Sequence, residues 1–480
     1  MEQTPKLNGL TEIFRFLRRN ETPIYIITPT PFSLLGLDQW VGALEFVSYF
    51  DIFDGQHPRA FVPSREGPQN FTSMEDVANY LVQHPQFVEK VKAKGGKAIF
   101  VMMDEETERL CAEIGLEVAL PPSKLRVRLD SKLETTRLGN EAGVASAPNC
   151  MGEAGNFAEL MKLATDAGLG SDLVVQTPYG DSGRTTFFIK SETDWDKHKS
   201  KIIGEPLKVM KRLNHLPGTI EGCATRNGTL VGPVMTDITG YEEITPYKGG
   251  WCGNDIATGL LPDGVPEKVR DMARKFGDRL YQEGYRGVFC IDFLLDTDDN
   301  EVYLGELNPR VSGATPPTHL ITSTYGGCPL FLFHLLEFMD VDYEIDIDQV
   351  QARWNDYDNW TQLILKQTED KVELLTQAPM SGIWQMNDDG KISFLRRALQ
   401  ITSLGDENEA FYLRVYGPGE YCYHGADLGC LLSRGRMQAD GRTLLERAKR
   451  WNAAIKAEFK SIPIAPDVYK PSDMTAAKWF

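Results

Sequence analysis

Four polar side chains with the potential for chemistry gather in one short stretch of the chain, GVFCIDFLLDTDDNEVYLGELNPRVSG. Two β-like runs in it are joined by the turn-forming sequence TDDN, which predicts a strand pair. Asp292 lies in the first run, and alternation along GELN places Glu306 and Asn308 on one face of the second. Oxygen ligands on two adjacent strands suit Mg²⁺, a hard cation that needs few protein ligands. Arg310, next in the same series, would hold an anion through two parallel hydrogen bonds.

A second interpretation makes Asp292 and Glu306 solvated positions on an exposed sheet face, with Arg310 as their ion-pair partner. Both carboxylates, however, fall within the most apolar runs of the chain. Ionised groups in apolar surroundings need partners, because an unpaired charge away from water is costly. The pattern therefore favours a metal site whose ligands are Asp292, Glu306 and Asn308.

Three stretches of different pattern would position these residues. In the first, residues 1–125, PIYIIT, KAIFVMM and LEVAL are typical of strands. DEETERLCAEIG is typical of a helix, with acidic residues in its first turn and Gly115 closing it. Strand, helix and strand at this spacing predict a parallel α/β domain. No G-x-G-x-x-G sequence accompanies it, so a dinucleotide role has little support.

The second stretch, residues 126–335, contains both helical and strand-like periodicities. It opens with the helical segment SKLETTRLGNEAGV and continues with two β-rich runs around a glycine-containing loop, LVVQTPYGDSGRTTFFIK. Strands are expected at KVMKRL, TIEGCATRN and TLVGPVMTD, followed by a helix in PEKVRDMARKFGDRLYQEG. The third stretch, residues 336–480, contains KISFLRRALQI, FYLRVYG and the helical LLERAKRWNAAIKAEFK, which predict a β-rich C-terminal domain.

The composition of the chain limits the kinds of molecule that the protein is expected to bind. The formal net charge is −17, from 68 acidic and 51 basic residues, and this field disfavours nucleic acid and anionic membranes. No apolar stretch approaches the roughly 20 residues of a membrane span, and the N-terminus lacks the pattern of a secretory signal. The eight cysteines have no metal-ligand spacing, which indicates free thiols in a reducing compartment. We therefore expect a cytoplasmic protein.

The segment GELNPR resembles the metal-binding E-x-N-x-R signature of the ATP-grasp superfamily, with Asp292 at the place of its first metal carboxylate. The resemblance extends back to about residue 125 in the order of elements. It implies the ATP-grasp fold, in which ATP lies between two α+β lobes. It also implies Mg²⁺, with Mn²⁺ as an alternative, and transfer of the γ-phosphate of ATP to a substrate carboxylate. An amine then attacks the acyl-phosphate, and Arg310 takes a catalytic role.

Two further segments of the resemblance concern the phosphates of ATP. The segment LDSKLETTRL resembles the one whose lysine contacts them, which implies an ATP-binding and catalytic role for Lys132. Judged by its position alone, a lysine near a helix start is usually just solvated. The segment LVVQTPYGDSGRTTFFI resembles the strand, glycine loop and strand that close over the phosphates, which implies a lid containing Gly180, Ser182, Gly183 and Arg184. Taken alone, G-D-S-G also fits an ordinary hairpin turn.

One position departs from the family pattern. Family members usually carry a lysine at the end of the strand that leads into the lid, where this chain has Gln176. Glutamine donates hydrogen bonds but brings no charge. Either Arg184 or a cation on the substrate side compensates, or phosphoryl transfer is impaired.

The remaining resemblances concern adenine and the substrates. The segment KVMKRL resembles the strand whose backbone pairs with adenine, which implies a hinge at Lys211, Arg212 and Leu213. In the following hairpin, Glu221 either faces the substrate pocket or is an ordinary strand residue. The glycine-rich segment ITPYKGGWCGNDIA, residues 244–257, is expected to be a substrate-closing loop, the alternative being a surface turn. Small residues after the arginine leave room for a substrate. The expected substrate-binding residues are Glu221, Lys248, Asn254, Arg310, Ser312 and Gly313.

We predict an ATP-dependent carboxylate–amine ligase that forms an amide bond between small, amino-acid-like molecules and releases ADP and phosphate. A biotin-carboxylase-like subunit is the first alternative. That family follows its arginine with R-x-Q-x-E-H, and here Ser312 and Ala314 replace the glutamine and glutamate. A nucleotide-binding module without catalysis is the second alternative, motivated by Gln176. The expected partners are a small carboxylate and a small amine, and homodimers are common among similar enzymes.

Overall fold

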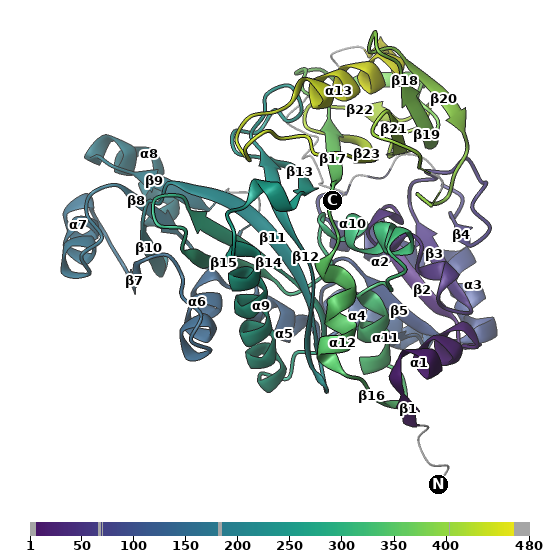
Figure 1. Ribbon diagram of the computed structural model, residues 1–480, viewed down its shortest axis with the longest axis horizontal. Helices are drawn as coiled ribbons and strands as arrows, with labels where there is room; N and C mark the ends of the chain where they lie inside the picture. Colours follow the sequence, from purple (N-terminus) through teal and green to yellow (C-terminus); the bar gives the residue numbers. More distant parts are fainter. Residues whose placement is uncertain (1–5, 66–68, 70, 181–184, 403, 465–480) are drawn as a thin grey trace.

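The protein is described by a computed structural model that covers residues 6–65, 69, 71–180, 185–402 and 404–464. Figure 1 shows three parts: a helix-covered sheet near the N-terminus, a small lobe containing β7 to β10, and a long curved sheet that continues into the C-terminal part. Among the described helices, none combines the length and the apolar character that a membrane span requires.

The N-terminal part is built on five parallel strands. Their spatial order is β4 (Ala60–Phe61), β3 (Leu44–Ser48), β2 (Ile24–Thr28), β5 (Lys97–Phe100) and β6 (Glu117–Val118). All of β2, IYIIT, is buried, as expected where both faces of a parallel sheet are covered. The helices of this part are α1 (Gly9–Arg18), α2 (Met74–Gln83), α3 (Pro85–Lys94) and α4 (Glu105–Ile114).

Helix α4 has the acidic first turn and the closing glycine that the sequence predicts. The Asp104 side chain accepts a hydrogen bond from the backbone N–H of Thr107 and so caps the first turn. The helix ends at Gly115, whose φ of 74° lies in the left-handed region. The predicted strand, helix and strand of the parallel α/β domain are confirmed.

The small lobe is an antiparallel sheet with two helices on one face. Its strands are, in spatial order, β7 (Asn149–Gly152), β10 (Leu207–Lys211), β8 (Leu173–Gln176) and β9 (Thr186–Ile189). Apolar side chains at alternate positions, such as Val175 and Val209, pack against α7 (Phe157–Asp166) and α8 (Glu192–Ile202). Alternation along the strands therefore turns Gln176 and Lys208 to the opposite face.

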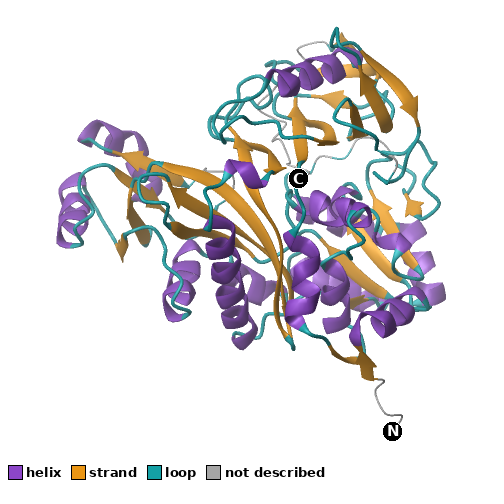
Figure 2. Cartoon of the chain, viewed as in Figure 1, coloured by secondary structure: helices purple, strands orange, loops and turns teal. Residues whose placement is uncertain are grey.

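The long sheet has ten antiparallel strands. In spatial order they are β15 (Val302–Asn308), β14 (Gly287–Asp296), β11 (His215–Thr225), β12 (Gly228–Thr239), β13 (Trp251–Ile256), β17 (Trp360–Lys366), β23 (Asp427–Arg434), β21 (Glu409–Arg414), β19 (Gly382–Met386) and β20 (Ile392–Arg396). The predicted hairpin of β14 and β15 is confirmed and lies at one end of this sheet. Figure 2 shows helices beside its central strands.

Helices and short sheets complete the molecule. Beside the long sheet lie α5 (Ser123–Leu129), α6 (Lys132–Glu141), α9 (Val265–Gln282), α10 (Thr315–Leu320), α11 (Phe331–Glu337), α12 (Ile347–Asn355) and, in the C-terminal part, α13 (Glu446–Glu458). The short sheets are β1 (Lys6–Asn8) with β16 (Asp342–Glu344), and β22 (Tyr421–Cys422) with β18 (Glu373–Gln377) and β24 (Lys460–Pro463). The predicted fold class, with a parallel α/β part before and a β-rich part after the central lobes, is confirmed.

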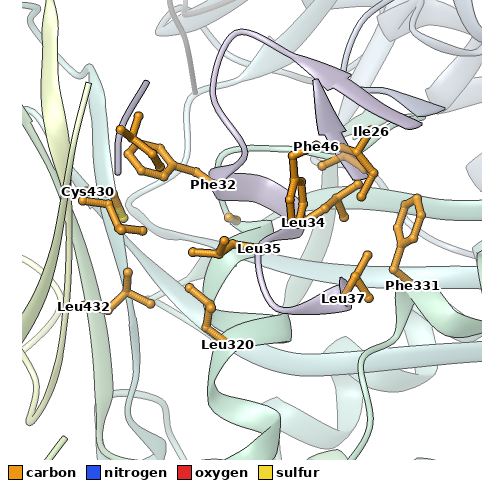
Figure 3. Packing of buried hydrophobic residues seen from close by; sticks show 14 of the residues in the cluster. Ile26, Phe32, Leu34, Leu35, Leu37, Phe46, Leu320, Phe331, Cys430 and Leu432 are labelled. Carbon is orange, nitrogen blue, oxygen red and sulfur yellow. The ribbon is translucent and has the colours of Figure 1, made fainter. Parts of the chain in front are cut away.

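The loop that follows β2 packs the N-terminal part against the long sheet. In Figure 3, Leu35 of this loop lies between Leu320 of α10 and the side chains of Cys430 and Leu432 on β23, and Phe32 lies beside Cys430. All five residues are at most 4% exposed and belong to one apolar core. The pairing of β13 with β17 also carries the long sheet across the domain boundary predicted at residue 335. The division at residues 125 and 335 stays a prediction.

Candidate active site

The two predicted metal carboxylates face one another on adjacent strands. Asp292 of β14 pairs directly with Glu306 of β15, and the ladder shifts register between Asp292 and Phe293. Such a bulge bends a strand and re-aims its side chains, and bulges are common beside functional sites. The side-chain amide of Asn308 donates to Asp292 Oδ2 at 3.3 Å. Three oxygen-bearing side chains therefore gather at one end of the long sheet.

The carboxylates at this point are crowded and poorly hydrated. Burial raises the pKa of Asp292 to about 7, and the nearby charge of Glu306 adds to the rise. Asp237 on β12 is buried beside it, and burial followed by the charge of Asp292 holds the pKa of Asp237 well above its usual range. The Thr219 hydroxyl lies 2.8 Å from Asp237 Oδ1 and 3.3 Å from Asp292 Oδ1. A bound cation would offset the repulsion between these groups.

The donor set fits a small hard cation that keeps ligands of its own. Asp292, Glu306 and Asn308 supply oxygen only, which is the ligand type of Mg²⁺. In the part of the chain that the structure describes, no group of three or more His, Cys, Asp or Glu side chains is arranged to hold a metal ion. Two carboxylates and one amide are too few to enclose an ion, so phosphate oxygens and water would have to complete the shell.

Lys132 connects this metal-binding face to the small lobe. It is the first residue of α6, whose N-cap Ser131 accepts a hydrogen bond from the helix backbone. Its ammonium nitrogen donates to Glu306 Oε1 at 2.9 Å and to the carbonyl oxygen of Gly180 at 2.7 Å. Its backbone N–H donates to Pro178 O at 2.9 Å. The lysine is 3% exposed, so the structure buries this cation beside the carboxylates.

Lys208 is a second buried cation, which sequence reasoning missed. It lies on β10 directly opposite Gln176 of β8, whose amide donates to the Thr186 hydroxyl at 3.1 Å. Burial lowers the pKa of Lys208 to about 8, while the charge of Glu306 raises it and that of Lys132 lowers it further. The segment KVMKRL was predicted as a strand, but only the register between β8 and β10 places this lysine beside Gln176.

Arg310 follows the end of β15, close to the carboxylates. One guanidinium nitrogen donates to Asn308 Oδ1 at 2.9 Å, and the other donates to Val311 O at 3.2 Å. Its Nε is buried and has no hydrogen-bond partner among the described residues. The following residues turn into α10: the backbone N–H of Ser312 donates to the Thr315 hydroxyl, and Gly313 O accepts from a glutamine of β17.

No protein-family profile matches this sequence, and no curated protein matches it. Solved structures do match. The biotin carboxylase domain of 2-oxoglutarate carboxylase from Hydrogenobacter thermophilus, solved with MgADP, ADP and bicarbonate, has a TM-score of 0.58 at 12% identity, covering 92% of this chain and 91% of that chain. N5-carboxyaminoimidazole synthase from Aspergillus clavatus, solved with ADP and 5-aminoimidazole ribonucleotide, has a TM-score of 0.56 at 13% identity, covering 91% and 98%.

A third similar structure is phosphoribosylglycinamide synthetase from Anaerococcus prevotii, with a TM-score of 0.54 at 14% identity, covering 92% of this chain and 100% of that chain. All three are ATP-grasp proteins. This chain has the ATP-grasp fold. At these identities the likeness is one of fold, and it confirms the fold that the E-x-N-x-R resemblance implies.

In this ATP-grasp fold the predicted hinge lies where β10 leaves the small lobe. The backbone N–H groups of Lys211 and Arg212 are already used, by Pro148 O and Asp172 O, each at 3.0 Å. The N–H of Leu213 makes no hydrogen bond to the described residues and stays available to a ligand. The Arg212 guanidinium lies 5.0 Å from the ring centre of an exposed aromatic residue, Phe188 on β9.

The predicted lid is only partly described. Ser182, Gly183 and Arg184 lie outside the described residues, so their predicted roles stay predictions. Gly180 is described: its φ is 140°, and a Cβ there would approach the Thr185 side chain to 2.3 Å. Glycine is therefore required at position 180, where the backbone contacts the Lys132 ammonium group and enters the lid.

Glu221 lies on β11, on the same sheet face as the metal carboxylates. It pairs with Cys290, which in turn pairs with Asn308. The carboxyl group is fully buried and accepts a hydrogen bond from the Thr315 hydroxyl. Burial raises its pKa to about 7, against the lowering effect of the hydrogen bond from Thr315. Both sequence interpretations place Glu221 in a strand. In the structure its side chain is on the sheet face that carries Asp292, Glu306 and Asn308.

The prediction of a loop through residues 244–257 is wrong for its second half. Residues 251–256 form β13, because they pair with β12 on one side and β17 on the other. Lys248 lies in the turn before this strand. Asn254 is fully buried, donates to Asp237 Oδ1 at 2.8 Å and accepts from Gln362 at 3.1 Å. Its described contacts are therefore with protein side chains near the carboxylates.

Proposed function

We propose that this protein is an ATP-dependent ligase that joins a small carboxylate to a small amine through an acyl-phosphate, with release of ADP and phosphate. The proposal rests on one group of neighbouring side chains. At the end of the long sheet of an ATP-grasp fold, a buried lysine pairs with one of two facing carboxylates, and an amide side chain links the other carboxylate to an arginine. The residues concerned are Lys132, Asp292, Glu306, Asn308 and Arg310.

The chemistry divides between these residues. Mg²⁺ held by Asp292, Glu306 and Asn308 would supply positive charge to the phosphate oxygens of ATP. Lys132, already placed between the lid and Glu306, orients the transferred phosphoryl group. A carboxylate oxygen of the substrate attacks the γ-phosphorus, and the bond to the β-phosphate oxygen breaks to release ADP.

The second step forms the amide bond. The amine nitrogen attacks the acyl carbon, the carbon–oxygen bond to phosphate breaks, and the nitrogen loses a proton. Arg310 orients the carboxylate and then stabilises the oxyanion of the tetrahedral species, for which its unpartnered Nε remains available. Closure of the lobes excludes water, which would otherwise hydrolyse the acyl-phosphate.

The charges around the site favour an amino-acid-like substrate. Arg310 offers a guanidinium to a carboxylate, while Glu221 and Asp237 on the same side of the sheet have no ion-pair partner among the described residues. A carboxylate beside an arginine is complementary to a zwitterion, whose ammonium and carboxylate groups are close together. Free amino acids are therefore the first donors to test.

A carboxylation reaction is the second candidate, because the biotin carboxylase domain of 2-oxoglutarate carboxylase is among the similar structures. In this chain the turn after Arg310 carries Ser312 and Ala314. Their short side chains lack the amide and carboxylate groups that the biotin-carboxylase pattern places there. A catalytically inactive nucleotide-binding module is the third candidate, and a second buried lysine beside Gln176 weakens its main motive.

The deciding experiment follows ATP consumption by the purified full chain with Mg²⁺. Pools of amino acids, other small carboxylates and amines are compared with bicarbonate, with and without biotin. Release of ADP and phosphate that requires a carboxylate–amine pair, with the amide product identified by mass spectrometry, supports the ligase. Turnover that requires bicarbonate and biotin supports the carboxylase instead. A homodimer stays a prediction, which size-exclusion chromatography with light scattering tests on the same sample.

A further inference from the structure

Lys208 is a buried cation without a described partner. Three lysines are buried among the described residues: Lys132, Lys208 and Lys366. Lys132 pairs with Glu306, and Lys366 pairs with Asp427. Lys208, only 1% exposed, makes no hydrogen bond or ion pair with any residue that the structure describes. An unpaired ammonium group inside a protein is costly, so a lysine held in this way indicates a ligand that the protein must receive.

The position of Lys208 identifies the face that this ligand would occupy. On β10 its neighbour Val209 points into the apolar core under α7 and α8, so Lys208 points to the other face of the small lobe. There it stands opposite Gln176 in the antiparallel ladder. Lys132 approaches the same end of β8: it donates hydrogen bonds to the carbonyl oxygens of Pro178 and Gly180, just after this strand, and its ammonium group also contacts Glu306.

We propose that Lys208 is a phosphate-binding residue that holds the polyphosphate chain of the nucleotide together with Lys132. The proposal rests on the proposed function only in requiring a nucleotide at this face of the small lobe. The Lys208 ammonium group and the Gln176 amide would face a polyanion from the small lobe, and the Lys132 ammonium group would face it from the start of α6. The carboxylates opposite them would hold its cation. The positive charge absent from position 176 is thus supplied by the adjacent strand.

Calorimetric titration of the full chain tests this role with three probes: Mg-ADP, inorganic tripolyphosphate and adenosine. We expect Lys208→Met to weaken Mg-ADP and tripolyphosphate binding by about 10- to 100-fold, the range of a lost charge-assisted hydrogen bond. Adenosine has no phosphate, so its affinity should be unchanged. Lys162→Met, on the exposed surface of the same lobe, is the matched control and should bind all three probes as the unmodified protein does.

Two further measurements separate a ligand role from a structural one. Exchange of the two facing residues, Gln176→Lys with Lys208→Gln, should restore affinity to within a few-fold, because the two side chains share one face of the ladder. The ligand-free Lys208→Met protein should melt at the same or a higher temperature, because the substitution removes an unpaired buried charge. A structural lysine would instead give a lower melting temperature and no rescue by the exchange.

Several results would overturn the proposal. One is binding of Mg-ADP and tripolyphosphate by Lys208→Met at unmodified affinity, and another is an equal loss of adenosine binding. Failure of the unmodified protein to bind either phosphate probe would remove the phosphate site altogether. The proposed ligase activity can fail separately: silence in every substrate pool, combined with Lys208-dependent Mg-ADP binding, would refute the reaction and leave the phosphate site standing.

Discussion

The ammonium nitrogen of Lys132 lies 2.9 Å from Oε1 of Glu306 and thereby joins the first turn of α6 to the edge strand of the ten-stranded sheet. The same nitrogen donates to the carbonyl oxygen of Gly180 at the start of the lid. A cation that binds Glu306 would compete with Lys132 for the carboxylate. Metal binding would therefore free Lys132 for a phosphate.

Glu306→Gln should lower the rate of ATP turnover by about 100-fold or more, because the amide keeps the shape of the side chain but removes the negative charge that binds the metal. The fold should persist, since Glu306 is partly exposed. Steady-state kinetics of phosphate release at saturating substrate measure the effect. Glu301→Gln is the matched control, because Glu301 lies on the same hairpin, is exposed and, among the described residues, pairs only with Lys268 of α9. A near-normal rate for Glu306→Gln would contradict the site assignment.

Mg-ADP should raise the melting temperature by several degrees, because the complex binds only the folded state. Without Mg²⁺ the shift should be smaller, since Asp237, Asp292 and Glu306 then repel the phosphates. Asp292→Asn relieves the crowding of buried carboxylates, so its ligand-free melting temperature should be unchanged or higher. Its additional shift with Mg²⁺ should nevertheless be lost. Differential scanning fluorimetry measures both, and a normal Mg²⁺-dependent shift in this variant would exclude Asp292 as a metal ligand.

Arg310→Lys should lower kcat/KM for the carboxylate substrate by about 100-fold, whereas the affinity for Mg-ADP should change by less than about threefold. Lysine keeps the charge but cannot reproduce a planar guanidinium that contacts Asn308 Oδ1 and Val311 O while its Nε stays available. Kinetics and calorimetry on one preparation separate the two effects. Equal losses of catalysis and nucleotide affinity would assign Arg310 to ATP rather than to the carboxylate.

Glu221 makes a prediction about pH and stability. Its pKa is about 7 in the folded protein and 4.5 for an ordinary glutamate, so between these values the folded state retains a proton that the unfolded state has lost. The folded state is therefore destabilised progressively as pH rises from 4.5 to 7, by on the order of 3 kcal/mol in total. Glu221→Gln cannot ionise. Relative to the unmodified protein, this variant should gain stability across that window.

Urea unfolding of both proteins at a series of pH values measures this difference directly. Because Asp237 and Asp292 also have raised pKa values, the unmodified protein contains their contributions as well. The difference between the two curves isolates Glu221, provided that the substitution leaves the neighbouring carboxylates in place. Parallel curves from pH 4.5 to 8 would show that Glu221 is ionised in the folded protein.

The central hairpin could be predicted from the sequence because its pattern is local. Alternating apolar side chains and a four-residue turn define β14 and β15, but the regular ladder from that turn only reaches the pair Phe293 and Leu304. The register shift after this pair, which the sequence did not predict, is what places Asp292 opposite Glu306. The same holds for the ends of α4, where Asp104 and Gly115 act within one turn. These features need no knowledge of distant segments.

Lys208 and β13 could not be found in this way, because both depend on pairing between distant segments. Lys208 faces Gln176 only through a register set between β8 and β10. Residues 244–257 looked like a loop because of their three glycines, yet a Cβ at one of them, Gly253, would approach Gln362 O to 2.1 Å. That glycine admits a neighbouring strand rather than a turn, and only the pairing of β13 with β17 reveals it.

The pairing of β13 with β17 also sets an order of events during synthesis on the ribosome. When β13 emerges, its partner β12 is already present, but β17 follows only after roughly a hundred more residues, a delay on the order of 5–20 s. Throughout that interval the nascent chain presents an open strand edge, the kind of surface that recruits other chains. Truncation before β17 would make this interval permanent. Shortened versions of the protein should therefore aggregate, even though every residue of the carboxylate site precedes the cut.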